Sequence, residues 1–87
     1  MNVEIRNSFV KDAKKLPPFK RILLEKIIQD MMDKKQISEL TSCKKLTGFK
    51  TAFRLRFGSY RIGFFYEKET VELVRVLSRK DIYKHFP

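Results

Sequence analysis

Two short alternating runs separated by Gly58-Ser59 are the feature that most restricts the fold of this chain. Residues 52–57 (AFRLRF) and 60–64 (YRIGF) both place apolar side chains at every second position, which is the pattern of a half-buried β-strand. Gly58-Ser59 has the length and composition of a two-residue type II′ turn. The sequence therefore predicts an antiparallel β-hairpin whose register is set by its turn.

This register assigns the hairpin side chains to two faces. With Gly58-Ser59 as the turn, Arg56 lies opposite Arg61 and Arg54 lies opposite Gly63. The apolar face then consists of Phe53, Leu55, Phe57, Tyr60, Ile62 and Phe64.

The second face carries three arginines, and we expect the glycine beside them to leave a hollow. Directly opposed arginines repel each other, so a sheet does not need them for stability. A bound phosphate would neutralise them, because guanidinium groups match phosphate oxygens. A face that is merely solvated usually has Glu or Thr between its arginines, and neither is present on this face. We therefore expect an anion-binding face rather than a face on which arginine only provides solubility.

The first part of the chain predicts a strand and two helices. Residues 3–6 alternate like a short strand, and Ser8 is a suitable N-cap for a first helix. Pro17-Pro18 ends that helix, and a second helix runs from about residue 19 to 35. Apolar residues cover about half of the second helix, more than the ~100° needed to face one layer. We expect them to pack on both the sheet and the first helix, rather than to be kept for a partner.

The remaining segments complete an α+β fold. Residues 36–50 look like a connection, residues 67–70 like a second turn, and residues 71–78 like a third meander strand of uncertain register. Residues 79–86 predict a short C-terminal helix. The sequence thus predicts a single domain, residues 1–87: a small antiparallel sheet with an N-terminal helical pair on one face and a short C-terminal helix. A chain of 87 residues supports one hydrophobic core.

Charge and composition restrict the partners. The chain has 20 Lys and Arg against 10 Asp and Glu, and residues 41–66 hold six basic side chains and no acidic one. This excess indicates a polyanionic partner: nucleic acid, an anionic membrane or an acidic protein. No apolar run approaches the ~20 residues of a membrane span, and no signal peptide is visible, so we expect a cytoplasmic protein. A single cysteine, Cys43, and a single histidine, His85, argue against a disulfide and against a protein-only zinc site.

Four segments together resemble the RelE branch of the RelE/ParE toxins. They contain a Leu-x-Gly, a Tyr-Arg after a short turn, and a terminal Arg-x-x-x-Tyr, in the order found in that branch: residues 46–48, 53–56, 58–62 and 76–83. Length, basicity and element order agree, so the resemblance covers nearly the whole chain. It implies a toxin of a type II toxin–antitoxin system that cleaves mRNA in the ribosomal A site without a metal ion or other cofactor. The ParE branch instead inhibits DNA gyrase.

The resemblance also implies roles for individual residues. Arg61 matches the arginine that holds the scissile phosphate, Arg79 the general acid toward the 5′-oxygen, and Tyr83 the tyrosine that stacks on the mRNA. Arg54 and Arg56 stand where well-studied members carry lysines, one of them a proposed general base. An arginine stays protonated above pH 12 and is a poor base, whereas charge stabilisation of the phosphate survives the change.

The other candidate residues have weaker patterns. Lys44, Lys45 and Lys50 lie outside the hairpin, and we expect them to add diffuse attraction to RNA. His85 is a minor candidate for acid–base work, and Phe49 could stack on a base. The implied partners are a cognate antitoxin, the ribosome and mRNA. Two alternatives stay open: a ParE-like inhibitor of DNA gyrase that is not an enzyme, and a plain basic RNA-binding module.

Overall fold

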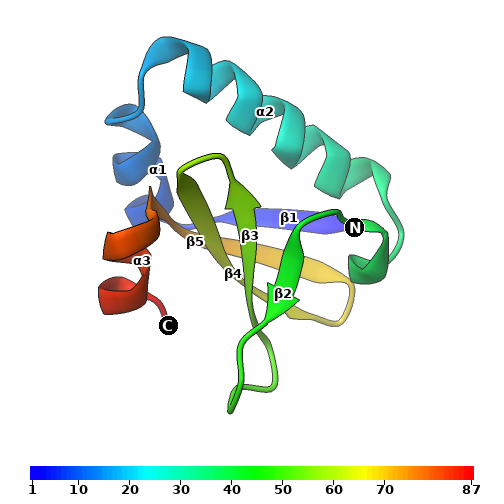
Figure 1. The fold of residues 1–87 in the computed structure, drawn as a ribbon. Coiled ribbons are helices and arrows are strands. Elements are labelled where there is room, and N and C mark those ends of the chain that lie inside the picture. Colours follow the sequence, from blue (N-terminus) through cyan, green and yellow to red (C-terminus); the bar gives the residue numbers. More distant parts are fainter.

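A five-stranded sheet with three helices forms the fold in the computed structural model, which describes all residues from 1 to 87 (Figure 1). The predicted hairpin, helical pair and C-terminal helix are all present. In chain order the elements are β1 (Asn2–Ile5), α1 (Asn7–Lys14), α2 (Pro18–Asp33), a 3-10 turn η1 (Ile37–Glu39), β2 (Cys43–Lys45), β3 (Ala52–Phe57), β4 (Tyr60–Glu67), β5 (Thr70–Ser78) and α3 (Arg79–His85).

The sheet is mixed, with the strand order β1-β5-β4-β3-β2. Strands β3 to β5 are antiparallel, as predicted. The unpredicted β2 also pairs antiparallel with β3, but β1 pairs with β5 in parallel. The prediction of a wholly antiparallel sheet was therefore wrong for its first strand. Alternation along a strand indicates which side chains are buried, but it carries no information about the direction of the strand. A short hairpin connection fixes antiparallel pairing, and no such connection joins β1 to β5.

The hairpin register is as predicted. Arg56 pairs with Arg61, and Arg54 pairs with Gly63. Gly58 has a φ of 59°, and Ser59 is not among the residues with positive φ, which fits a type II′ turn. A register shift lies between Gly63 and Phe64, where β4 pairs with β5. This irregularity explains why the apolar residues of β5 fall on both faces of the sheet.

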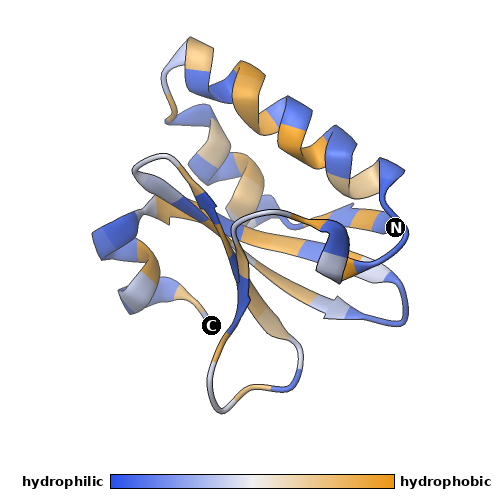
Figure 2. Ribbon diagram, turned by 45° about the vertical axis from the view of Figure 1, so that its right-hand side comes forward, coloured by the Kyte–Doolittle hydropathy of each residue, from blue (hydrophilic) through white to orange (hydrophobic).

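Two hydrophobic clusters lie on opposite faces of the sheet. The first lies between the sheet and helices α1 and α2, and it contains Phe9, Leu16, Leu24, Met31, Leu40, Leu55, Phe57, Ile62, Phe64, Val71, Leu73 and Val76. The second lies beneath α3 and contains Leu46, Ala52, Val74, Ile82 and Phe86. The hydropathy colouring shows the apolar stretches of the central strands that supply both clusters (Figure 2). The apolar face of the hairpin therefore packs as predicted.

Phe86 fills the space that was expected to be a hollow beside the arginines. A Cβ atom on Gly63 would lie 2.5 Å from the Phe86 ring, so the ring rests directly on the glycine backbone. The ring also packs against Phe65, with 5.2 Å between ring centroids. The prediction of an open hollow was wrong, because the residue that fills it arrives from a distant part of the chain.

The expectation that α2 buries its whole apolar arc was also wrong. Within this arc Leu24 and Met31 are buried, but Leu23 and Met32 are 44% and 47% exposed. Phe19 and Ile22, on the same helix, are 62% and 56% exposed. The N-terminal turns of α2 lie farther from the sheet than its C-terminal turns do (Figure 1). The apolar side chains in the first half of α2 that point away from the sheet are therefore left uncovered.

Helix α1 completes the edge of β5 beyond the end of β1. Ser8, predicted as an N-cap, instead donates from its hydroxyl to the Val74 carbonyl at 2.6 Å. The buried Asp12 carboxylate accepts the Val76 N–H at 3.1 Å and pairs with Arg75 at 2.7 Å. Backbone groups at this edge thus have partners although no strand covers them.

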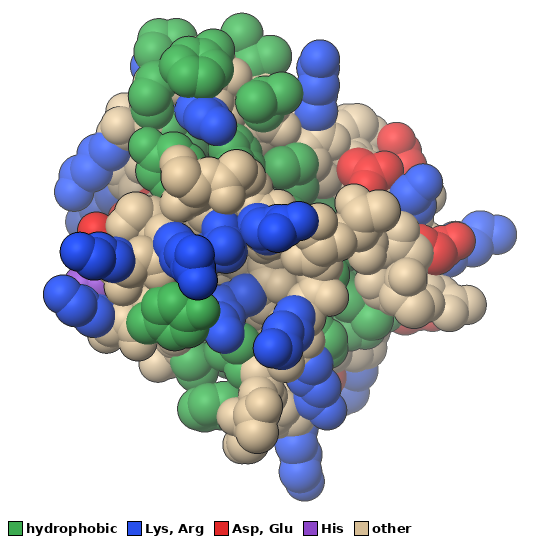
Figure 3. Space-filling view, viewed as in Figure 1, with side chains coloured by type: hydrophobic (Ala, Val, Ile, Leu, Met, Phe, Trp, Pro, Cys, Tyr) green, Lys and Arg blue, Asp and Glu red, His purple; other side chains and the backbone are tan.

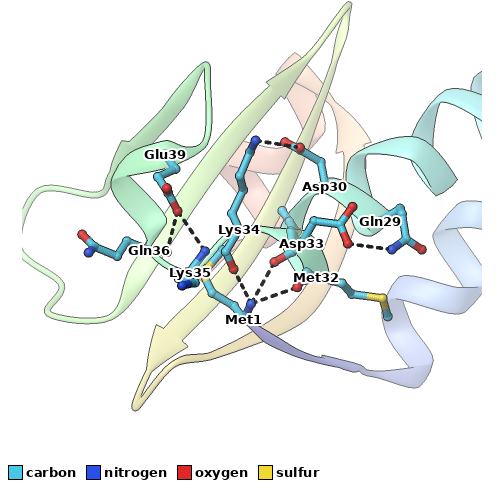
Figure 4. A network of polar contacts seen from close by, with 10 residues as sticks. Met1, Gln29, Asp30, Met32, Asp33, Lys34, Lys35, Gln36 and Glu39 are labelled. Atoms are coloured by element: carbon cyan, nitrogen blue, oxygen red, sulfur yellow. Dashed lines mark hydrogen bonds and ion pairs between the residues drawn. The ribbon is translucent and has the colours of Figure 1, made fainter.

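A polar network joins the N-terminus to the end of α2 (Figure 4). The Met1 ammonium donates to the carbonyls of Met31 and Met32 at 3.2 and 3.1 Å, and to that of Lys34. These are carbonyls left open by the helix end, where a positive charge is favourable. The network holds the start of the chain, and with it β1, against the C-terminal end of α2.

Candidate functional site

Residues of β3, β4 and α3 meet on the sheet face opposite α1 and α2. The hairpin contributes the arginines, and α3 begins directly after β5 at Arg79. The Arg79 N–H donates to the Ser59 carbonyl at 3.0 Å, and the Ser78 hydroxyl accepts the Asp81 N–H at 3.2 Å. These bonds anchor the start of α3 to the hairpin turn and cap it, so residues 20 positions apart share one surface.

Arg61 is held by the turn that precedes it. Its Nη1 donates to the carbonyls of Gly58 and Tyr60 at 3.0 and 2.9 Å. The side chain is half-buried, and its Nε and Nη2 make no hydrogen bond within the protein. A guanidinium fixed on one side with free donors on the other is prepared to bind an anion without further ordering.

Arg54 stacks on Tyr83. The Arg54 Cζ lies 4.3 Å from the centre of the tyrosine ring, which is within cation–π range. Tyr83 is nevertheless 62% exposed. The Arg54 hydrogen bond and charge, followed by the charge of Arg79, lower the pKa of the Tyr83 phenol below its ordinary value. Both residues were predicted for the site, but their direct contact was not.

Arg56, which pairs with Arg61 in the β3–β4 register, also lines a pocket between α2 and the hairpin. This pocket has a volume of about 430 Å³, and its lining is Lys20, Leu23, Lys26, Ile27, Asp30, Arg56, Phe57 and Gly58. Lys20 and Lys26 therefore extend the basic surface toward α2. Sequence reasoning missed both lysines, because α2 carries many charged residues and no local pattern distinguishes these two.

A pocket of about 260 Å³ lies around Arg54 and Tyr83. Its lining consists of Lys44, Lys45, Leu46, Thr47, Phe49, Arg54, Tyr83 and Phe86. Lys44 pairs with Arg54 in the β2–β3 register, so the segment predicted as a plain connection contains a short edge strand. Three residues are too few for an alternating pattern to be recognised.

The remaining predicted residues lie at the margins. Lys50 is exposed in the loop between β2 and β3 and does not line the pocket. His85 is exposed on the last turn of α3. Burial raises the pKa of the Cys43 thiol to about 11, so this thiol is protonated at neutral pH and a weak nucleophile.

The arrangement is a basic surface with exposed aromatic rings. Figure 3 shows Lys and Arg side chains gathered across the middle of one face, with hydrophobic side chains above them over the start of α2. No group of three His, Cys, Asp or Glu side chains is close enough to hold a metal ion. No helix has the length and apolar content to cross a membrane. Cations and aromatic rings together suit a single-stranded nucleic acid.

Comparison with known proteins places this fold among toxins. Residues 3–83 match the family model described as "ParE toxin of type II toxin-antitoxin system, parDE". The chain is 36% identical over 88 residues to Toxin RelE3 of Methanocaldococcus jannaschii, and the match covers all of both proteins.

Solved structures agree. The RelB–RelE antitoxin–toxin complex from Methanococcus jannaschii contains a chain with a TM-score of 0.82 and 33% identity, covering 97% of this chain and 99% of that one. The intact Escherichia coli RelBE complex matches with a TM-score of 0.70 at 18% identity, over 88% of this chain and 94% of that one, which shows the shared fold. The matches define a type II toxin. The chain belongs to the RelE branch of the RelE/ParE toxin family, as its sequence motifs indicated.

Proposed function

We propose that this toxin is a ribosome-dependent mRNA endonuclease that inhibits translation in the cytoplasm. The observation that carries the proposal is that one face of the sheet holds both a prearranged Arg61 and a Tyr83 stacked on Arg54. The first suits the phosphate of a ribonucleotide and the second its base. The ribosome holds the mRNA in its A site, and the toxin completes the reaction centre there.

The proposed reaction uses the substrate's own 2′-hydroxyl. The 2′-oxygen forms a bond to the adjacent phosphorus, and the bond from phosphorus to the 5′-oxygen breaks. The products are a 2′,3′-cyclic phosphate and a 5′-hydroxyl. Arg61 and Arg56 stabilise the charge that develops on the phosphate, and Arg79 supplies the proton to the leaving 5′-oxygen. Positioning and positive charge account for catalysis, and no metal ion bound by the toxin takes part.

The proton of the 2′-hydroxyl needs an acceptor. Arg54 and Arg56 are unsuitable because they stay protonated. His85 lies on the same helix as Arg79 and Tyr83 and is exposed. The neutral imidazole of a histidine can accept a proton, so we propose His85 as the candidate acceptor.

We also propose a cognate antitoxin as the partner of this toxin. Phe19, Ile22 and Leu23 expose apolar surface on α2, beside the pocket that Lys20 and Lys26 line. A partner segment with apolar and acidic residues would satisfy both features at once. The solved structures that the chain resembles include RelB–RelE complexes, which supports such a partner here.

A second candidate function is ParE-like inhibition of DNA gyrase without RNA cleavage. The observation that favours it is the family-model match, which carries the ParE description. Two assays separate the candidates: primer extension on translated mRNA and supercoiling by purified gyrase. New mRNA ends that depend on ribosomes support the nuclease, whereas inhibited supercoiling without new ends supports the gyrase inhibitor.

The decisive variant is Arg61→Ala, with Arg21→Ala as a control at an exposed arginine on α2. We expect Arg61→Ala to lower the cleavage rate by ~10²–10³, the usual effect of losing one prearranged donor. Its free energy of unfolding should change by no more than about 1 kcal/mol, because one lost hydrogen bond is exposed, the other only partly buried, and the repulsion with Arg56 is relieved. Cleavage should persist after the toxin is stripped of metal. If Arg61→Ala cleaves like the parent, or unfolds, the proposed role of Arg61 is wrong.

A further inference from the structure

The pocket around Arg54 and Tyr83 contains a second exposed aromatic ring, that of Phe49. Phe49 is 49% exposed and belongs to neither hydrophobic cluster. A single exposed apolar side chain is ordinary on a protein surface. This one, however, lines a concave pocket of about 260 Å³ together with Tyr83 and three cationic side chains, Lys44, Lys45 and Arg54.

The local structure holds Phe49 in this place. Leu46 is buried in the second cluster, and its N–H donates to the Ala52 carbonyl at 2.9 Å. The Phe49 N–H donates back to the Leu46 carbonyl at 3.3 Å, which closes a tight turn. Gly48 takes a φ of 86° in this turn, a conformation that favours glycine. The Leu-x-Gly motif therefore anchors one residue in the core and presents the next aromatic ring to the pocket.

Tyr83 alone does not provide stacking surface for two bases. The Arg54 guanidinium lies 4.3 Å from the centre of its ring and covers one face. A second base in the pocket would need another aromatic surface, and Phe49 is the other aromatic ring exposed there. Lys44 is the cross-strand neighbour of Arg54, so cations for a neighbouring phosphate are available on the same strands.

We propose that Phe49, Lys44 and Lys45 form a second nucleotide subsite, in which Phe49 stacks on a base next to the one held by Tyr83. The ligand class is a single-stranded ribonucleotide, recognised by stacking and by charge attraction to its phosphates. The proposal rests on the proposed nuclease function and extends it to a further nucleotide of the mRNA. Because stacking tolerates every base, the subsite adds affinity and position rather than strict sequence choice.

Binding of a ribosome-free oligonucleotide tests the subsite directly. The probe is a fluorescein-labelled hexaribonucleotide with 2′-O-methyl groups, which blocks cleavage because no free 2′-hydroxyl remains. We expect Phe49→Ala to raise its Kd by about 5- to 150-fold, the range for one stacked base, and Phe49→Tyr to retain affinity. Phe19→Ala, at an exposed phenylalanine on α2, is the matched control and should leave the Kd unchanged.

An abasic hexamer of the same backbone separates stacking from other effects. Phe49→Ala should not change the Kd of this probe further, because no base is present to stack. Lys44→Ala and Lys45→Ala should each reduce the slope of log K against log salt by about 0.7, the value for one phosphate contact in a single strand. If Phe49→Ala binds the normal hexamer like the parent, or weakens both hexamers equally, the subsite is refuted.

The outcome is independent of the nuclease test. If the parent fails to cleave translated mRNA but Phe49→Ala still weakens the normal hexamer selectively, the subsite stands and the proposed nuclease falls. If the parent cleaves and the Phe49 variants bind like it, the subsite alone falls.

Discussion

A single contact, the stack of Arg54 on Tyr83, changes what both side chains can do. The stack places a permanent positive charge against an exposed phenol, and it lowers the pKa of that phenol. It also holds the ring in one orientation before a substrate arrives, which reduces the cost of ordering a flexible side chain on binding. Tyr83 is therefore prepared to act mainly through its ring surface.

The first prediction concerns this ring. If Tyr83 stacks on a base, Tyr83→Phe should retain most of the mRNA cleavage and Tyr83→Ala should lose it, because a stacked base contributes ~1–3 kcal/mol. Cleavage of translated mRNA by equal amounts of the three proteins provides the measurement. Equal losses in both variants would show instead that the hydroxyl is what matters.

The second prediction concerns the Tyr83 pKa. Arg54→Ala should raise it toward its ordinary value, because the largest cause of its lowering is removed. Ultraviolet titration of tyrosinate, with a Tyr83→Phe variant to assign the signal, measures the shift. A lowered pKa means that the folded state favours the ionised phenol. The resulting stabilisation begins as the pH rises through this lowered pKa, and it is complete above the ordinary pKa of about 10. Removing Arg54 should therefore change stability through Tyr83 in alkaline solution and not at neutral pH.

At the scale of elements, the side chains of Phe86 and Asp12 attach helices α3 and α1 to the sheet. Phe86 fits against Gly63 and holds α3, and Asp12 bonds to Arg75 and to the Val76 N–H and holds α1. Both contacts lie on β4 and β5, the central strands of the sheet. The position of Tyr83 above Arg54 thus depends on a close approach between a ring and a glycine.

The third prediction follows from that close approach. Gly63→Ala should lower the free energy of unfolding by ~1–3 kcal/mol, the usual cost of overpacking, because its Cβ would lie 2.5 Å from the Phe86 ring. Thermal unfolding measures the loss. A double variant, Gly63→Ala with Phe86→Leu, is the control, and it should be less destabilised than the two single changes added together. A Gly63→Ala protein as stable as the parent would contradict the packing described here.

The fourth prediction concerns Asp12. Asp12→Ala should cost about 3 kcal/mol, because it leaves a partly buried arginine and the Val76 N–H without their partner. Urea unfolding of Asp12→Ala measures the change, with the exposed pair Arg6–Glu72 as the comparison. Glu72→Ala should cost less than about 1 kcal/mol, as exposed ion pairs do. Similar losses in the two variants would show that burial does not distinguish the pairs.

The whole molecule separates its charges from its exposed apolar surface, yet keeps them adjacent. Basic residues occupy the middle of one face, and the apolar start of α2 lies beside them (Figure 3). A net charge of +10 on 87 residues favours association with polyanions. Exposed apolar surface next to such charges is typical of a site that binds another protein.

The fifth prediction is that the native operon supplies a partner for this surface. Purification of the tagged toxin from its own operon should yield a complex with a small protein whose bound segment contains apolar and acidic residues and folds on binding. A Leu23→Asp variant should weaken the complex, whereas Val10→Asp on α1 serves as a control at another exposed apolar position. Recovery of only the free 87-residue chain would refute the proposed antitoxin.

The sequence by itself determined the hairpin, its register and the separation of arginines from apolar residues. It also determined the order of the helices and most of the strands, apart from the short strand β2. These features are local: a two-residue turn and a period of two decide them within a dozen residues. The order of the motifs likewise indicates the toxin family and the candidate residues Arg54, Arg61 and Tyr83.

Only the tertiary structure decided how distant segments meet. The parallel pairing of β1, the fit of Phe86 against Gly63 and the stack of Arg54 on Tyr83 join residues that no local pattern relates. The same holds for β2, which places Lys44 beside Arg54, and for the exposure of Phe19 on α2. Such contacts depend on the packing of the whole chain. The alternation of side chains along a strand predicts which of them are buried, but it does not predict which residues they contact.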